Sequence, residues 1–234
     1  MRSRRAASPW PAPAFALALA ALLPLAALSC RPVSPGLPLL ASADFEDGTA
    51  AGWAPNDPAH WRVAADGPSL VYELVAPGTP GPVRAPTSFS LWTGHDVSSF
   101  ELTGRLRCDA DPASAVRDMC VVFHYLDPAH FSYVHFAGSS DAVHNIIGLV
   151  DGADRVKINA EPAGASVFRL TDRSWHAFKV AYDARTGEVR AYLDDLGAPI
   201  LTARVRAGAH GLVGVGSFDD TGAFDDLALR GKKS

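Results

Sequence analysis

Residues 119–137 read MCVVFHYLDPAHFSYVHFA, which places two alternating apolar runs on either side of a short polar turn. Runs that alternate with a period of two and are rich in Val, Phe and Tyr predict β-strands. The turn is Asp127-Pro128-Ala129-His130. An Asp-Pro pair is typical of tight turns, because Asp hydrogen-bonds the local backbone and Pro presets φ. This stretch therefore predicts an antiparallel hairpin.

The same pattern recurs along most of the chain. Further alternating runs bounded by Gly, Pro and Asp lie at 70–75, 100–108, 145–150, 154–159, 175–182, 188–194, 200–205, 211–217 and 224–230. Turn signals at Asp151-Gly152 and Arg185-Thr186-Gly187 separate successive runs. So many strands in one domain imply two stacked antiparallel sheets. The predicted fold class is all-β, a two-sheet jelly-roll sandwich.

The composition of the chain excludes some classes of structure and of binding partner. Of 234 residues, 48% are hydrophobic and 20% are charged, which is enough apolar material for a buried core and excludes a disordered chain. There are 21 Lys and Arg against 25 Asp and Glu, a formal net charge of −4. Nucleic-acid-binding domains carry basic patches and an excess of positive charge. We therefore expect no nucleic-acid partner.

The first thirty residues have the pattern of an export signal. A basic start, MRSRR, precedes an uncharged apolar run over residues 14–28, which is too short to span a bilayer comfortably. Residues 26–30, AALSC, resemble the lipobox of bacterial lipoproteins, in which the cysteine becomes the lipidated N-terminus. We predict a lipoprotein signal peptide over residues 1–29 and lipidation of Cys30. Cleavage without lipidation is the alternative.

The rest of the chain divides into a tether and one domain. Residues 30–42 are rich in Pro and carry one charge, as tethers do, and residues 43–231 contain the strand pattern. The leader carries three Arg and no acid, so its removal changes the net charge from −4 to −7. We expect an exported protein in the bacterial envelope, periplasmic or surface-facing, that meets the membrane through its lipid anchor alone.

Strand parity predicts which side chains share a face. If Asp127 pairs with His130, the core face of the hairpin carries Val121, Phe123, Tyr125, Ser132, Val134 and Phe136. The opposite face carries His124, Tyr133 and His135 beside Val122, Leu126 and Phe131. On residues 100–108 the core set is Phe100, Leu102, Leu106 and Cys108, which leaves Glu101, Thr103, Arg105 and Arg107 outside. A slip of one residue would exchange the two faces.

Four of the eight His residues lie between residues 124 and 144, and Asn145 follows them. His, Tyr, Asn and Arg together suit acid–base chemistry on an acidic sugar, where one group removes a proton and another protonates the leaving oxygen. The predicted catalytic residues are His135 or His124 as base and Tyr133 as acid. The predicted substrate-binding residues are Arg105, Arg107, Asn145, His144 and Lys157. The alternative is that these are ordinary polar-face residues. A zinc site is a third interpretation, although no HExxH motif or Cys–His spacing supports it.

Four segments carry a resemblance to a known family. They are FEDG…GW near residue 45, VVFHYLDPAHFSYVHF, WHAFKVAYDARTGEVRAYLDD and GLVGVGSFDDTGAFDD. This order resembles concanavalin A-like lectin/glucanase jelly rolls, and among them bacterial laminin-G-like domains and the 3-keto-disaccharide hydrolase domain family. The resemblance covers residues 43–231 and implies a concave sheet that holds carbohydrate. Polysaccharide lyases of this fold use His, Tyr, Asn and Arg, whereas the ExDxxE motif of its glucanases is absent here.

Three kinds of function therefore remain open. The first is a lipoprotein that binds carbohydrate on the concave face of its jelly roll. The second is a polysaccharide lyase or a glycoside-hydrolase-like enzyme that acts on a uronate-containing glycan. The third is a structural or interaction lipoprotein of the envelope without sugar binding.

Acidic residues cluster near both ends of the predicted domain. Terminal strands of jelly rolls often pair, which would bring Glu46 and Asp47 close to Asp225 and Asp226. Carboxylate oxygens without sulfur suit Ca²⁺. We predict a structural calcium ion there and expect no other required cofactor. Turn capping and protection of edge strands are the alternative role of these acids.

Two cysteines lie at facing ends of consecutive predicted strands. In an exported protein, Cys108 and Cys120 are candidates for a disulfide. Parity places Cys108 toward the core and Cys120 away from it, so a bridge requires a local bulge. Both the bridge and two free thiols remain open.

Overall fold

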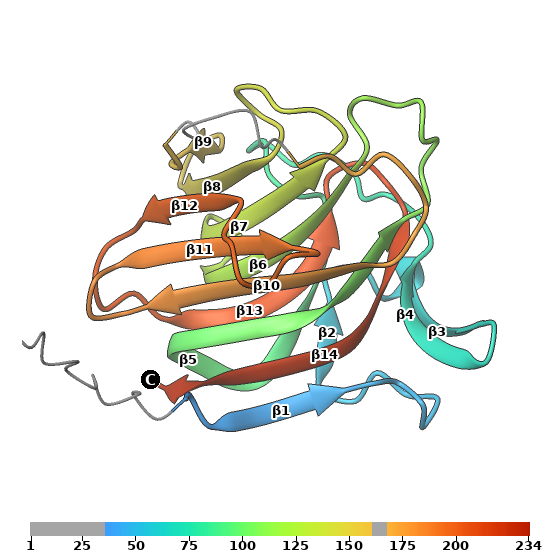
Figure 1. The fold of residues 1–234 in the computed structure, drawn as a ribbon, viewed down its shortest axis with the longest axis horizontal. Coiled ribbons are helices and arrows are strands. Elements are labelled where there is room, and N and C mark those ends of the chain that lie inside the picture. The colour runs from blue at the N-terminus through green and yellow to red at the C-terminus, as the bar shows by residue number, and fades with distance from the viewer. Residues whose placement is uncertain (1–35, 161–167) are drawn as a thin grey trace, which may run out of the picture. The chain divides into compact units, whose positions relative to one another are not determined.

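One long strand, β5 (Ser88–Cys108), connects two layers of antiparallel strands in the computed structural model, which describes residues 36–160 and 168–234 (Figure 1). The first part of β5 pairs with β2 (Trp53–Pro55) and β13 (Gly211–Ser217). The remainder pairs with β10 (His176–Asp183) and β14 (Gly222–Lys233). Because β5 belongs to both layers, the ladder hydrogen bonds form one continuous 14-stranded network.

The β6 layer contains the strands that extend from β13. These are β6 (Asp118–Asp127), β7 (His130–Ala137), β8 (Ile146–Asp151) and β9 (Val156–Lys157). In the β10 layer, β10 continues into β11 (Glu188–Leu193) and β12 (Leu201–Arg204). On the other side of β5, β14 pairs with β1 (Leu39–Ala43) and β4 (Ser69–Leu74), and β4 pairs with β3 (Trp61–Asp66). A single 3-10 turn, η1 (Pro58–His60), precedes β3.

The main hydrophobic core combines side chains from both layers. Phe100 and Leu102 of β5 pack there with Phe123 of β6, Phe178 of β10 and Leu229 of β14, all of them fully buried. The predicted fold class, an all-β jelly-roll sandwich, is confirmed. Among the described residues, no helix is long and apolar enough to cross a membrane.

A bulge in β6 changes the predicted pairing of the hairpin. Asp127 faces His130 as expected, but Phe123 faces Ser132, so three residues of β6 lie opposite one residue of β7. His124, at the bulge, has a φ of 52°. Because the shift amounts to two residues, the faces predicted for the rest of the hairpin remain correct.

Within the bulge, two side chains exchange faces. His124 points to the main core, where its ring lies 4.2 Å from that of Tyr182. Tyr125 points to the outer face of the β6 layer and packs against Phe89 and Phe131. The predicted faces of His124 and Tyr125 were therefore wrong, because a bulge leaves no reliable mark in an alternating pattern.

The N-terminal boundary of the domain is earlier than predicted. β1 pairs with β14 over Leu39–Ala43, and the carbonyl of Pro38 accepts a hydrogen bond from the amide of Gly231. Leu40 packs against the main core. The predicted tether over residues 30–42 is therefore wrong from Leu39 onward. The predicted signal peptide and Cys30 lie outside the described residues.

A truncation tests whether β1 belongs to the folded domain. A chain that begins at Asp44 should be about 2 kcal/mol less stable than one that begins at Gly36, because it exposes Leu40 and leaves one edge of β14 unpaired. Urea unfolding of both chains measures the difference. Equal midpoints would show that β1 contributes nothing to stability.

Candidate functional site

The outer face of the β6 layer is covered rather than open. A second apolar cluster lies there, formed by Phe89, Leu91, Cys120, Val122, Phe131, Tyr133, Ile146, Val150 and Phe218. Residues 76–87, which we call the roof segment, contribute Val83 and Ala85 to this cluster. The expected face of exposed catalytic groups is thus an apolar surface under a second layer of chain.

Polar contacts hold the roof segment in place. The amide of Arg84 donates to the Asp154 carboxylate at 2.8 Å, and the Arg84 guanidinium pairs with Asp219 at 2.7 Å. The Thr87 hydroxyl donates to the carbonyl of Phe218. The guanidinium groups of Arg84 and Arg155 lie over the Phe218 ring, 5.1 and 4.6 Å from its centroid. These contacts attach the roof to the loop after β13 and to the turn between β8 and β9.

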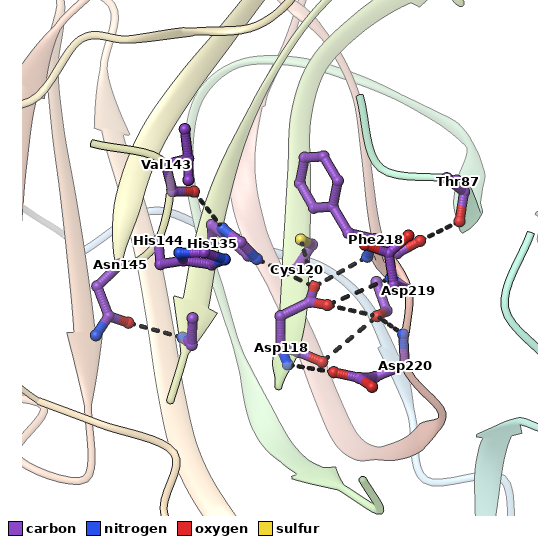
Figure 2. A network of polar contacts seen from close by, with 12 residues as sticks. Thr87, Asp118, Cys120, His135, Val143, His144, Asn145, Phe218, Asp219 and Asp220 are labelled. Atoms are coloured by element: carbon purple, nitrogen blue, oxygen red, sulfur yellow. Dashed lines mark hydrogen bonds and ion pairs between the residues drawn. The ribbon is translucent and has the colours of Figure 1, made fainter. Parts of the chain in front are cut away.

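Beneath this cover lies a buried polar network centred on Asp118, at the start of β6 (Figure 2). Its carboxylate accepts hydrogen bonds from the amide of Phe218 at 2.9 Å and the hydroxyl of Ser217 at 3.1 Å. The thiol of Cys120 lies 3.5 Å from Asp118 Oδ2, and Nε2 of His135 lies 3.2 Å from the same oxygen. All three side chains are buried.

The neighbours of His135 fix the orientation of its ring. Nδ1 donates to the carbonyl of Val143 at 2.9 Å, since a carbonyl can only accept. Nε2 faces the Asp118 carboxylate, so both ring nitrogens lie next to oxygen atoms. Burial raises the pKa of Asp118. Attraction to His135 and hydrogen bonds from backbone amides outweigh that effect and lower this pKa below its ordinary value.

The loop before β8 gathers three of the predicted substrate-binding residues near His135. His144 pairs with Asp141 at 2.8 Å, and its ring lies 5.6 Å from that of His135. Lys157 donates to the Asp141 carbonyl at 3.4 Å. The Asn145 carbonyl oxygen accepts from the Ala137 amide at 2.7 Å, and its NH₂ group donates to Ser140 and Phe168. Asn145 therefore stabilises this loop.

Burial contradicts the catalytic roles predicted for Tyr133 and His135. Tyr133 is fully buried, and its hydroxyl has no hydrogen-bond partner among the described residues. Its ring fills the space across from Gly148, where an added Cβ would lie only 2.3 Å from it. Burial raises the pKa of Tyr133 far above its ordinary value. A polysaccharide cannot contact either side chain.

Arg105 and Arg107 lie in the other layer, which corrects the prediction that they join the histidines. Both guanidinium groups lie over the Trp175 ring, at 4.8 and 5.1 Å from its centroid. Arg107 also pairs with Asp66 and Asp109, each at 2.7 Å. The prediction failed because β5 turns from one layer into the other, so its second half does not neighbour β6.

The acidic residues near the two ends of the domain meet Arg105. Its guanidinium pairs with Asp225 and, at 3.0 Å, with Asp226. Glu46 accepts hydrogen bonds from the hydroxyl of Ser69 and the amide of Leu70. The Asp47 carboxylate instead accepts from Thr49 within its own turn. The predicted approach of the terminal strands is correct, since β1 pairs with β14. Calcium binding stays a prediction, at a place where two of the four carboxylates already pair with Arg105.

The predicted disulfide does not form. Cys108 belongs to the main core, whereas Cys120 belongs to the cluster beneath the roof segment, and both are free. The parity argument was therefore correct for both residues. A bridge required a bulge near Cys120, but the pairing of β6 with β7 is regular there, and the bulge lies at the other end of β6, at residues 124–126.

Two hollows flank the β6–β7 hairpin. The roof hollow, about 460 Å³, lies between the roof segment and the outer face of the β6 layer, and Tyr125, Phe89 and Phe131 are among the residues that line it. The end hollow, about 470 Å³, is lined among others by His124, His130, His210, Arg204 and Arg206. Burial lowers the pKa of His124 to about 3, so its imidazole is neutral at ordinary pH.

Sequence reasoning missed the roof segment and Asp118. The segment reads APGTPGPVRAPT, a Pro-rich run of the kind that usually indicates an exposed loop, so only its unusual length was a signal. Asp118 directly precedes the predicted strand that starts at Met119, and nothing in the local pattern indicates that its side chain is buried.

Comparisons with known proteins agree with the observed architecture. No family model and no curated protein matches the sequence. Carbohydrate-binding module CBM66 from Bacillus subtilis superposes with a TM-score of 0.51 at 15% identity, over 76% of this chain and 95% of the module. Domain 4 of an extracellular arabinanase from Geobacillus stearothermophilus, solved with arabinotriose, superposes with a TM-score of 0.52 at 12% identity. The match covers 86% of this chain and 96% of that domain. A β-glucanase from Bacillus licheniformis superposes with a TM-score of 0.52 at 10% identity, over 84% of this chain and 99% of the glucanase.

At these identities the similarity defines the fold. The chain has the concanavalin A-like lectin/glucanase jelly-roll fold, as the sequence resemblance predicted.

The pH dependence of stability tests the buried network. Burial, with repulsion from Asp118, raises the pKa of Asp220 to about 6. The ordinary pKa of this carboxyl, which applies to the unfolded chain, is 3.8, so the folded state binds the proton more tightly. The free energy of unfolding therefore falls as the pH rises from about 4 to about 6 and stays lower above pH 6. Asp220→Asn should therefore raise the free energy of unfolding by about 1 kcal/mol at pH 7.5 and leave it unchanged near pH 4.

Urea unfolding at the two pH values makes this comparison. Asp219→Asn is the matched control, since it removes an exposed carboxylate that pairs with Arg84 and should not stabilise the protein. An equal gain for Asp220→Asn at both pH values would contradict the assigned cause.

Proposed function

We propose that this domain binds carbohydrate in the roof hollow, with Tyr125 as the stacking platform. The position of Tyr125 carries the proposal. The β6 bulge turns its ring outward into the hollow, where it is partly exposed. The apolar face of a sugar ring packs on such an aromatic surface.

The surroundings of Tyr125 keep the platform rigid. Its ring centroid lies 5.6 Å from that of Phe89 and 5.7 Å from that of Phe131, and both of these side chains are buried. Asn56 joins the roof to the sheet, since its side chain bonds the Thr87 carbonyl and the Phe89 amide. A preformed hollow of this kind loses little conformational entropy when a ligand binds.

The names of structures with the same fold support the proposal. One is a carbohydrate-binding module, one is an arabinanase domain in complex with arabinotriose, and one is a lectin solved with methyl-α-D-galactose. These similarities support a saccharide as the proposed class of ligand. The aromatic lining supports the roof hollow as the proposed binding site.

Binding fits the observed chemistry better than cleavage does. A general base works best with a pKa near the working pH, whereas burial lowers that of His124 to about 3. His135 and Tyr133 are buried beneath the roof. A glycosidase needs two carboxylates that flank the scissile bond, and the ExDxxE motif is absent. We therefore propose a binding module and not a lyase or hydrolase.

Tyr125→Ala tests this proposal. The substitution removes the platform and should weaken binding of the retained polysaccharide at least tenfold, whereas Tyr125→Phe keeps the ring and should bind nearly as well. The measurement is affinity electrophoresis against a panel of neutral and uronate-containing polysaccharides.

The control is Trp175→Ala, which removes a partly exposed aromatic side chain from the other layer and should leave binding unchanged. Ultraviolet absorbance is followed in the same mixtures, and new unsaturated ends would reveal lyase activity and overturn the binding-only proposal. If no polysaccharide in the panel slows the migration of the wild-type domain, carbohydrate binding is refuted and an interaction or structural role in the envelope takes its place.

We also propose that the domain is exported and lipid-anchored through Cys30, on the basis of the lipobox-like AALSC at residues 26–30. In a bacterial host, Cys30→Ser should abolish incorporation of labelled palmitate and release the protein from the membrane fraction. Cys108→Ser is the control, because that thiol is buried in the folded core and should leave both results unchanged. Unaltered labelling of Cys30→Ser would refute the anchor.

A further inference from the structure

Three side chains with different donor atoms converge inside the β6 layer. Cys120 on β6 lies directly opposite His135 on β7 in the ladder. Asp118 lies two residues before Cys120 and therefore on the same face of the strand. One donor atom from each residue, a carboxylate oxygen, a thiol sulfur and an imidazole nitrogen, lies within 4.8 Å of the other two. Figure 2 shows these three groups pointing toward one another.

The imidazole has a donor atom available in this cluster. Nε2 of His135 is buried and makes no hydrogen bond of good geometry among the described residues, although Asp118 Oδ2 is 3.2 Å away. The other nitrogen, Nδ1, is held by the carbonyl of Val143 at 2.9 Å. A metal-bound histidine usually donates its second N–H to a carbonyl or carboxylate in this way, which fixes the ring.

Neighbouring groups also hold the carboxylate in place. The amide of Phe218 and the hydroxyl of Ser217 both donate to Asp118. Two of the three separations between donor atoms are 3.2 and 3.5 Å. Ligands of a tetrahedral zinc ion, at about 2.0–2.3 Å from the metal, lie roughly 3.3–3.8 Å apart. Small side-chain movements would therefore suffice to enclose an ion.

The charges of the three donor groups suit a divalent ion. A dication would bind the Asp118 carboxylate, Nε2 of a neutral His135 imidazole and the Cys120 thiolate, and any proton displaced from these donor atoms would leave to solvent. The positive charge of the ion is then offset by one carboxylate and one thiolate, so the buried site carries no net charge.

From these observations we propose that Asp118, Cys120 and His135 form a buried binding site for a divalent transition-metal ion of the zinc class. Thiolate and imidazole ligands select such ions over calcium or magnesium. A fourth ligand can come from water or from Tyr133, whose hydroxyl is buried nearby without a hydrogen-bond partner in the part of the chain that the structure describes. The site lies beneath the roof, so its role is structural and is independent of carbohydrate binding.

Metal titration of the purified, reduced protein tests the site. Cobalt(II) should bind with a stoichiometry of one and produce tetrahedral d–d bands together with a thiolate-to-cobalt charge-transfer band. Zinc should displace the cobalt and raise the melting temperature. Cys120→Ser should abolish the charge-transfer band, and His135→Gln should weaken metal affinity at least tenfold. Loading during refolding is run in parallel, because the cluster is buried.

Cys108→Ser and His130→Gln are the matched controls. The first removes a buried cysteine from the main core, and the second removes an exposed histidine of the β6–β7 hairpin. Both variants should bind cobalt as the wild type does. If Cys120→Ser does not fold, persistence of the wild-type charge-transfer band in a variant that carries both Cys30→Ser and Cys108→Ser identifies Cys120 as the ligand, because the chain has three cysteines. Failure of the wild type to bind cobalt or zinc under either loading condition, or an unchanged cobalt spectrum in folded Cys120→Ser, overturns the proposal.

Discussion

The buried contact between Asp118 and His135 is the interaction on which the rest of this face depends. It links β6 to β7 at 3.2 Å, and its two partners extend the link further. The Asp118 carboxylate holds the end of β13 through Ser217 and Phe218, while His135 holds the loop before β8 through Val143. Phe218 in turn packs beneath Arg84 of the roof segment. An unpaired charge at this depth would be costly, so these segments must come together as one unit.

A second constraint, the bulge in β6, decides what the protein presents to solvent. Two extra residues turn Tyr125 toward the roof hollow and His124 toward the main core. The same face of the sheet thus has an accessible aromatic end and a closed polar end. The accessible end suits a saccharide, and the closed end suits a small ion. This division explains why residues that look catalytic in the sequence, such as His135 and Tyr133, are buried.

Alternation and turn residues in the sequence predicted most of the strands and the all-β class. The elements that were missed have weak patterns. β1 lies in a Pro-rich stretch, β2 has only three residues, and in β3 two adjacent Ala residues interrupt the alternation. The first half of β5 carries polar and Gly residues among its apolar ones. The candidate site was harder to predict, because Arg105 and His135 lie on strands whose layers cannot be read from local periodicity.

The fold class, the two faces of the hairpin away from the bulge and the opposite orientations of Cys108 and Cys120 could be predicted from the sequence, because side-chain alternation is a local property of a strand. The folded structure was needed to show that the two thiols are free, that the roof segment covers the histidine face, that Arg105 meets Asp225 and Asp226, and that Asp118, Cys120 and His135 converge. These outcomes depend on bulges, on the crossing of β5 between layers and on long-range contacts of a loop. None of these is encoded in the spacing of neighbouring residues.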